Sequence, residues 1–274
     1  MPVQRAAPVG FSVATPSPVC AGGYGNTGQM ADNDPLVLRS DQDGCCTLTL
    51  NRPEKLNALR PGSFVALREH LEAIAGDPTV HCVVLSGAGR SFCAGHDLEA
   101  IASGEHAPSR HFEAETIDVL EQLAQPTIAR LHGHCFTGGL ELALGCDFLV
   151  AAASTKIGDT HGQWGLVPIW GMSVRLPERV GRSMAKQLMF TSRRIDGTTA
   201  AQIGLVDRSV PDEDLDDAVA VLVAEIMANS AGTNRRVKRL IADGDDLGRT
   251  EALAHERALP YGVPEDMAER MTGA

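Results

Sequence analysis

A repeated pattern of apolar strand, glycine-rich loop and helix constrains the fold of this chain more than any other feature of its sequence. Residues 80–85 form an apolar run that predicts a buried strand, and glycines then punctuate residues 87–95. A helical pattern follows over residues 112–123 and stops before Pro126, which cannot continue a helix. This first unit therefore predicts an α/β arrangement.

The same pattern recurs directly downstream. A strand is predicted over residues 127–131, Gly138 and Gly139 open an apolar helix over residues 140–144, and residues 148–152 predict another buried strand. Units of this kind joined by short connections predict a spiral or layered α/β core rather than a sandwich.

The flanking segments carry weaker signals. Residues 46–50 alternate like a strand, and a helix follows in which Ser63 is a candidate cap. This helix is predicted to end before residue 77, and its apolar positions fall mostly on one face: Val65, Leu67, Leu71 and Ile74. The last hundred residues are mostly helical, with helices predicted over residues 184–190, 212–227, 235–241 and 247–259.

Three regions are predicted from these patterns. Residues 1–30 are rich in Pro, Gly, Ala and Ser without apolar periodicity, so we expect a disordered extension, with Met30 as an alternative start. Residues 31–210 are predicted to form the core, and residues 211–274 a helical C-terminal region.

Composition excludes several classes of protein. The formal net charge of -11 opposes binding to nucleic acid, because non-specific affinity comes largely from Lys and Arg replacing counterions. No apolar run approaches the roughly 20 residues needed to span a bilayer, and no secretory signal opens the chain. We therefore expect a soluble cytoplasmic protein with no nucleic-acid or membrane partner.

The cysteines indicate neither a disulfide framework nor a zinc site. They are odd in number, contain no C-x-x-C pair, and are best interpreted as reduced thiols. His132 and His134 resemble a short metal-binding pair, but no Cys, Asp or Glu lies at a spacing that completes the site, so both are interpreted as structural and no metal is expected.

The two glycine loops have the composition of a site for an anionic oxygen. Glycine permits close approach and the dihedral angles that aim backbone N–H groups at one point. One loop is Cys93-Ala-Gly-His and the other is Thr137-Gly-Gly. The second leads directly into a helix, whose N-terminal N–H groups and dipole favour negative charge.

Glu141 follows Gly138 by three residues, which places both on one helix face about one turn apart. A carboxylate beside such a loop is suited to moving protons. The alternative is a first-turn glutamate that only complements the helix dipole.

Three segments resemble the enoyl-CoA hydratase/isomerase (crotonase) family. They are NRPEKLNAL at residues 51–59, GRSFCAGHDL at 89–98 and GHCFTGGLELALGCD at 133–147. Shorter matches extend the resemblance from about residue 36 to about residue 266. It implies a crotonase-like spiral of ββα units with a helical C-terminal oligomerisation region, assembled as a homotrimer or dimer of trimers.

Several residue roles follow from this resemblance. It implies oxyanion donors at the N–H groups of His96 and Gly138, with Glu141 matching the first catalytic glutamate of the hydratases. It further implies a CoA thioester as substrate, no cofactor beyond it, and contacts to the substrate from six positions: Lys55, Leu56, Ala58, Ala94, Asp97 and Leu98. Since CoA is a polyanion, local cations such as Arg52, Lys55 and Arg90 are needed against the negative average field.

The chain departs from the family where the second catalytic glutamate is expected. The segment at residues 157–161 reads IGDTH, so His161 occupies that position. Histidine exchanges protons near neutral pH and is a candidate replacement. The alternative is that His161 only fills the pocket, which leaves Glu141 to act alone or with Asp159.

Two smaller departures lie in the glycine loops. His96 stands where the family usually has a small residue, and its imidazole shapes acyl selectivity, takes part in proton transfer, or only points to solvent. Thr137 replaces a more usual glycine, which predicts a narrower pocket.

These features predict hydration of a 2-enoyl-CoA to a 3-hydroxyacyl-CoA. The alternatives are another reaction on the same enolate, namely double-bond isomerisation, hydrolysis or decarboxylation, and a catalytically silent acyl-CoA-binding protein. No serine-hydrolase elbow, P-loop or dinucleotide fingerprint occurs in the chain, which disfavours those classes.

Overall fold

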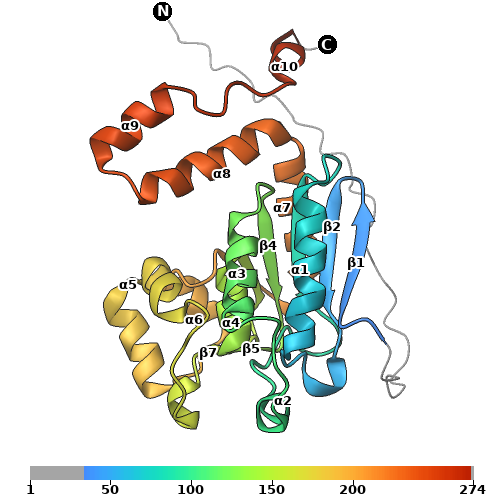
Figure 1. Ribbon diagram of the computed structural model, residues 1–274, viewed down its shortest axis with the longest axis vertical. Coiled ribbons are helices and arrows are strands. Elements are labelled where there is room, and N and C mark those ends of the chain that lie inside the picture. Colours follow the sequence, from blue (N-terminus) through green and yellow to red (C-terminus); the bar gives the residue numbers. More distant parts are fainter. Residues whose placement is uncertain (1–33, 273–274) are drawn as a thin grey trace, which may run out of the picture.

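The computed structural model describes residues 34–272, so the predicted extension over residues 1–30 lies outside the described residues. A six-stranded sheet in the order β1-β2-β3-β4-β6-β8 forms the centre of the molecule (Figure 1). Only β1 and β2 pair antiparallel, and the other neighbours are parallel. The strands are β1 Val37–Gln42, β2 Cys45–Leu50, β3 Cys82–Gly87, β4 Thr127–Leu131, β6 Phe148–Ala152 and β8 Arg208–Val210. A second, parallel pair consists of β5 His134–Phe136 and β7 Lys156–Gly158.

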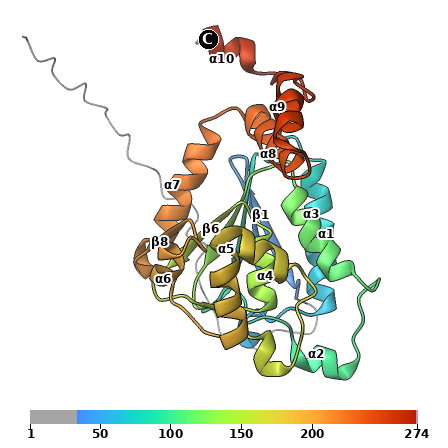
Figure 2. The same ribbon diagram turned by 90° about the vertical axis from the view of Figure 1, so that its left-hand side faces the viewer.

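Helices cover both faces of the large sheet (Figure 2). On one face lie α1 Pro61–Ala75 and α3 Phe112–Gln122, and on the other lies α7 Leu215–Met227. Alternate residues of β3 pack on opposite faces of the sheet, where two separate hydrophobic clusters lie. Val83 and Leu85 belong to the larger cluster, and Val84 belongs to the smaller one, together with residues of α7. Burial on both faces explains why this strand is a continuous apolar run.

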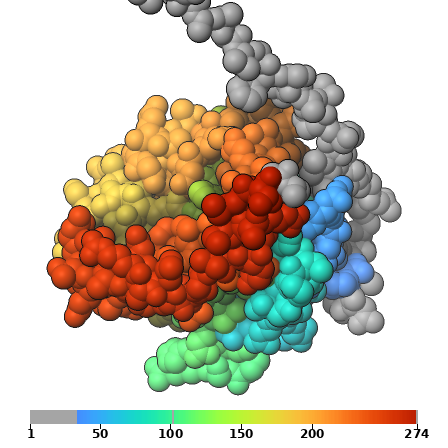
Figure 3. All heavy atoms as spheres, turned by 90° about the horizontal axis from the view of Figure 1, so that it is seen from above, coloured from blue at the N-terminus to red at the C-terminus, as the bar shows by residue number. Residues whose placement is uncertain are grey.

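The remaining helices are shorter or peripheral. They are α2 Leu98–Ser103, α4 Gly138–Leu144, α5 Met172–Thr191, α6 Gly197–Gln202, α8 Ala231–Asp245, α9 Arg249–Arg257 and α10 Met267–Thr272, with 3-10 turns η1 Pro53–Lys55, η2 His161–Trp164 and η3 Asp212–Asp214. Helices α8, α9 and α10 lie across one end of the sheet (Figures 1 and 3) and bury no residue fully. The predicted boundary between residues 210 and 211 stays a prediction, although α7 packs on the sheet.

The secondary structure agrees closely with the prediction where strands are buried. The strands at residues 127–131 and 148–152 have the predicted bounds, and the helix at 112–123 ends one residue earlier. Helix α5 begins well before residue 184, and Gly181 interrupts it with a positive φ of 75°. The short strands β5 and β7 were not predicted because three residues carry no usable periodicity.

The cap of α1 was predicted wrongly. Ser63 is the third residue of the helix, and its hydroxyl accepts a hydrogen bond from the backbone N–H of Arg60, the actual N-cap residue. Pro61 starts the helix earlier because its missing N–H has no partner there in any case. The buried face consists of Phe64, Leu67, Leu71 and Ile74, while Val65 is only half-buried.

No helix of the described residues combines the length and apolar character needed to cross a membrane.

Candidate active site

The two glycine-rich loops lie side by side beyond the carboxyl ends of β3 and β4, at the end of the sheet away from α8 (Figure 1). Loop residues at the carboxyl ends of parallel strands are where α/β folds gather their sites. The first loop pairs with β5: the N–H of Cys93 donates to the carbonyl of His134 at 2.9 Å, and the N–H of Phe136 donates to the carbonyl of Cys93 at 3.1 Å.

Glycine permits the close approach of the two loops. A Cβ on Gly139 would lie 2.7 Å from the carbonyl oxygen of Cys93 and 2.8 Å from its sulfur. Gly95 has a positive φ of 107°, which reverses the first loop just before His96. Side chains at these two positions would force the loops apart.

The backbone amide nitrogens of His96 and Gly138 lie close together where these loops meet. A Cβ on Gly138 would lie 3.5 Å from the amide nitrogen of His96, and one on Gly95 would lie 3.7 Å from the amide nitrogen of Gly138. Within residues 34–272 neither N–H has a hydrogen-bond acceptor. Gly138 is also the first residue of α4, so its N–H is free of the helix ladder. The pair is therefore available to an anionic oxygen.

Glu141 lies one turn into α4 and is 1% exposed. Its Oε1 accepts hydrogen bonds from the backbone N–H groups of Trp170, at 3.0 Å, and Met172, at 3.2 Å. Burial raises the pKa of this carboxyl, although the charge of His161 and the two N–H donors oppose the rise. The carboxyl is held by the backbone of another loop and is not a solvated cap.

His161 lies between two carboxylates. Its Nδ1 is 2.6 Å from Oδ1 of Asp159, which also accepts the His161 backbone N–H at 3.1 Å. Its Nε2 is 3.6 Å from Oε2 of Glu141, close enough for an ion pair but longer than a hydrogen bond. Burial lowers the pKa of His161, but the hydrogen bond to Asp159 and the charges of both carboxylates outweigh burial and raise it overall. The structure thus brings Asp159, His161 and Glu141 into one cluster.

Thr137, in the second glycine loop, contacts the segment that leads to His161. Its Oγ1 accepts the N–H of Thr160 at 3.2 Å and hydrogen-bonds the Thr160 hydroxyl, and its N–H donates to the carbonyl of Gly158. The side chain is 7% exposed and engaged by the neighbouring loop. Its φ of 49° marks a backbone conformation unusual for a β-branched residue.

His96 does not extend into solvent. Its ring lies 4.7 Å from the ring of Trp170, and burial lowers its pKa, with a smaller opposing effect from Asp97. A lowered pKa keeps this imidazole neutral at pH 7.

The residues predicted to contact CoA form one strip beside the first loop. The N–H of Ala94 donates to the carbonyl of Leu56 at 2.9 Å, and Leu98 is 42% exposed at the start of α2. Leu56 has a positive φ of 51° after η1. Ala58 lies in the same turn, and its carbonyl accepts a hydrogen bond from Arg52 at 2.7 Å.

The charged residues of this strip are occupied by other protein groups. Asp97 forms an ion pair of 2.8 Å with Arg52 and accepts the N–H groups of Glu99 and Ala100 at the start of α2. Lys55 pairs with Glu99 at 2.8 Å. The positive charges of Arg52 and Lys55 are thus partly balanced within the protein, while Arg90 is exposed.

His132 and His134 contact the first glycine loop. Nε2 of His132 is 3.0 Å from the carbonyl oxygen of Gly89, and Nδ1 of His134 is 2.8 Å from the hydroxyl of Ser91. These contacts support their structural interpretation. In the described part of the chain no group of three or more His, Cys, Asp or Glu side chains is placed to hold a metal ion. The cysteines of this part are free thiols, and Cys20 lies outside it.

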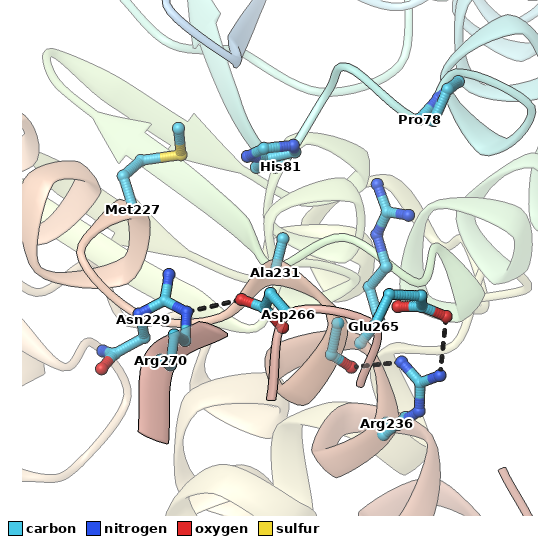
Figure 4. Close-up of a pocket in the computed structure, with 11 residues that line it drawn as sticks. Pro78, His81, Met227, Asn229, Ala231, Arg236, Glu265, Asp266 and Arg270 are labelled. Atoms are coloured by element: carbon cyan, nitrogen blue, oxygen red, sulfur yellow. Dashed lines mark hydrogen bonds and ion pairs between the residues drawn. The ribbon is translucent and has the colours of Figure 1, made fainter. Parts of the chain in front are cut away.

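A cavity of about 610 Å³ lies at the other end of the molecule, between α8, the segment before α10 and the loop that precedes β3 (Figure 4). Two of its three arginines form ion pairs, Arg236 with Glu265 at 3.0 Å and Arg270 with Asp266, and Arg235 donates to the carbonyl of Val80 at 2.8 Å. This cavity brings together no acid/base pair comparable with Glu141 and His161.

Sequence reasoning missed two contributors to the cluster. Trp170 and Met172 supply the N–H donors that fix Glu141, and Trp170 also packs against His96. The only sequence signal was a tryptophan, one of just two in the chain, flanked by Pro168 and Gly171.

Several known proteins are similar to this chain over most of its length. The model of the enoyl-CoA hydratase/isomerase family matches residues 40–271. The chain is 32% identical to a probable peroxisomal enoyl-CoA hydratase 1 of Arabidopsis thaliana, over 89% of this chain and 93% of that protein. It is 30% identical to a crotonyl-CoA hydratase of Syntrophomonas wolfei, over 86% of this chain and 93% of that protein.

Solved structures show the same fold. An enoyl-CoA hydratase from Bacillus anthracis superposes with a TM-score of 0.82 at 31% identity, over 86% of this chain and 95% of that chain. The crotonase-like fold expected from the sequence is thereby confirmed, and a reaction on an acyl-CoA thioester is supported. The chain belongs to the enoyl-CoA hydratase/isomerase family.

Proposed function

We propose that this protein hydrates 2-enoyl-CoA thioesters to 3-hydroxyacyl-CoA. The observation that carries the proposal is the buried Glu141–His161 pair, 3.6 Å apart, next to two backbone N–H groups that have no acceptor in the described residues. Hydration needs a base for water, an acid for the α-carbon and a site for the enolate oxygen, and this arrangement offers one group for each task.

The thioester oxygen is held by the N–H groups of His96 and Gly138. Negative charge grows on this oxygen as the enolate forms, so fixed donors stabilise the transition state more than the substrate. The position of Gly138 at the start of α4 supports the same role, because the helix N-terminus favours negative charge.

Glu141 takes a proton from water as the water oxygen bonds to the β-carbon. The electrons of the double bond move to the enolate, whose α-carbon then takes a proton from Nε2 of His161. The proton on Glu141 returns to His161 across the gap between them, and one water is consumed overall. Asp159 holds Nδ1 and keeps the acidic nitrogen directed at Glu141.

The strip formed by Leu56, Ala58, Ala94 and Leu98 is proposed as the contact surface for the CoA part of the substrate. Its partly exposed side chains and their position beside His96 support this role. Asp97 and Lys55 act within the strip through their ion pairs with Arg52 and Glu99, which fix the start of α2.

Assembly as a homotrimer, or as a dimer of trimers, is also proposed. Large apolar side chains are exposed directly after His161 and along α5: Trp164, Leu166, Val167, Ile169, Val174 and Phe190. Exposed apolar groups gathered in one region mark surfaces that other chains cover. A second copy of this chain is the proposed partner, and light scattering that returns only the monomer mass would contradict it.

The proposal is tested by incubating the protein with crotonyl-CoA and following the loss of the conjugated thioester absorbance. Glu141→Gln is expected to lower kcat by about 10²- to 10⁴-fold, since a general base contributes that much. Glu69→Gln on the exposed side of α1 is the matched control and should retain the wild-type rate.

Other outcomes separate the alternatives. Wild-type activity in Glu141→Gln would contradict the proposed mechanism. Conversion of a 3-enoyl-CoA to the conjugated isomer without hydration would indicate isomerisation, release of free CoA would indicate hydrolysis, and tight binding without turnover would indicate a silent homologue.

A further inference from the structure

The side chain of Trp170 occupies the space directly beside Gly138. A Cβ on Gly138 would lie 2.4 Å from Cζ3 and 3.1 Å from Cε3 of the indole, so the six-membered ring packs against the glycine itself. Trp170 is only 4% exposed. The ring therefore lies next to one of the two N–H groups proposed to bind the thioester oxygen.

Contacts on several sides hold this ring in place. The rings of Phe64 and Trp170 are 4.8 Å apart in an edge-to-face arrangement, and the ring of His96 is 4.7 Å away on a tilted plane. The backbone is fixed as well, because the N–H of Trp170 donates to Glu141 and its carbonyl accepts from Arg175 at 2.9 Å. Moving the indole would break packing with both α1 and the first glycine loop.

An acyl group bound at this site has little freedom in direction. Its carbonyl oxygen must reach the N–H groups of His96 and Gly138, and its α- and β-carbons must face Glu141 and His161. Carbons beyond them that run along Gly138 meet the indole, which already fills the volume there. Protein interiors are close-packed, so a long chain can enter only by displacing the ring.

We propose that Trp170 sets the upper limit on acyl-chain length and makes this site selective for short 2-enoyl groups. The inference rests on the proposed acyl-CoA site and adds the size of its substrate. The competing interpretation is that Trp170 only fills the core, which predicts no dependence on chain length.

The experiment compares crotonyl-CoA with trans-2-decenoyl-CoA in the wild type and in Trp170→Leu. The wild type should favour crotonyl-CoA, and Trp170→Leu should raise kcat/KM for the decenoyl substrate relative to crotonyl by at least about tenfold, because a single methylene in a shaped pocket already changes specificity by that much. Phe112→Leu on α3 removes an aromatic ring away from Gly138 and should leave the ratio unchanged. Trp170→Phe should shift the ratio less, in the same direction, and serves as the test if the leucine variant does not fold.

An unchanged ratio, a parallel loss on both substrates, or a wild type that prefers the decenoyl substrate overturns the proposal. If the wild type turns over no enoyl-CoA, calorimetric binding of butanoyl-CoA and decanoyl-CoA makes the same comparison without catalysis. The decanoyl affinity should then rise at least about tenfold relative to butanoyl in Trp170→Leu, and an equal change for both esters overturns the size limit independently of hydration.

Discussion

The two halves of the candidate site are built from different parts of the chain. The half proposed to bind the thioester oxygen consists of backbone N–H groups at His96 and Gly138, positioned by glycines and by pairing with β5. The half proposed to move protons consists of the side chains of Glu141, His161 and Asp159. The position of the backbone donors depends on loop geometry, whereas the ability of the side chains to move protons depends on their ionisation.

This difference explains where the chain can depart from its family. Histidine at position 96 is compatible with the proposed oxyanion donor, because the donor is its backbone N–H and any residue other than proline supplies that group. In the proposed mechanism, histidine at position 161 changes the proton chemistry, because an imidazole stands where the resemblance implies a carboxylate. The backbone half should therefore respond to steric changes, and the side-chain half to changes of charge and pH.

Among the variants that test the two halves, Gly138→Ala is expected to change the rate most. The added methyl would lie 2.4 Å from the indole of Trp170, so either the ring or the N–H of residue 138 must shift. We expect kcat/KM for crotonyl-CoA to fall by about 10²- to 10³-fold, as for loss of one oxyanion donor. Steady-state kinetics measure the fall.

Gly244→Ala is the matched control for this variant. Gly244 lies in α8 with no atom within 4 Å of an added Cβ, so alanine should raise the free energy of unfolding by about 0.5–1 kcal/mol and leave the rate unchanged. Wild-type kinetics in Gly138→Ala would contradict the expected displacement of this N–H and would mean that the indole alone moves.

Asp159→Asn tests the side-chain half. Asparagine removes the charge of Asp159, which raises the pKa of His161, so burial should dominate and lower that pKa. We expect kcat to fall about 10- to 100-fold, as when the partner that orients a histidine is removed. The alkaline limb of the pH–rate profile should move to lower pH.

The direction in which the alkaline limb moves decides whether His161 is the group that titrates there. In the wild type the pKa of His161 is raised, so its stabilising interaction is complete below about pH 6.5 and is lost as the pH rises through the folded-state value. Asp159→Asn should lower the pH at which His161 loses its proton, so the variant should be active over a narrower pH range. If the alkaline limb of the pH–rate profile stays at the same pH in Asp159→Asn, a group other than His161 sets that limb.

The smallest effect is expected from Thr137→Val, which removes the hydroxyl that joins the two halves through Thr160. Loss of one hydrogen bond should lower the free energy of unfolding by about 0.5–1.5 kcal/mol, with a few-fold loss of kcat. Chemical denaturation and kinetics measure both. Thr137→Ser keeps the oxygen and should behave like the wild type, whereas equal effects of both variants would deny the hydroxyl a linking role.

Local patterns predicted much of the fold. The strands at 127–131 and 148–152 were read correctly because buried parallel strands are continuous apolar runs. The cap of α1 was predicted at the wrong residue, because the helix already starts at Pro61. The strands β5 and β7 were not predicted, because they pair over only three residues and so short a strand has no recognisable periodicity.

The sequence by itself determined the glycine loops, the helix that follows the second loop, and the place of Glu141 one turn into that helix, since these depend on spacing within a few residues. Only the tertiary structure decided that His161 faces Glu141, that Asp159 holds His161, that Asp97 is engaged by Arg52, and that Trp170 packs on Gly138. Those contacts join segments from different loops and helices, and packing between them, rather than local periodicity, sets which side chains meet.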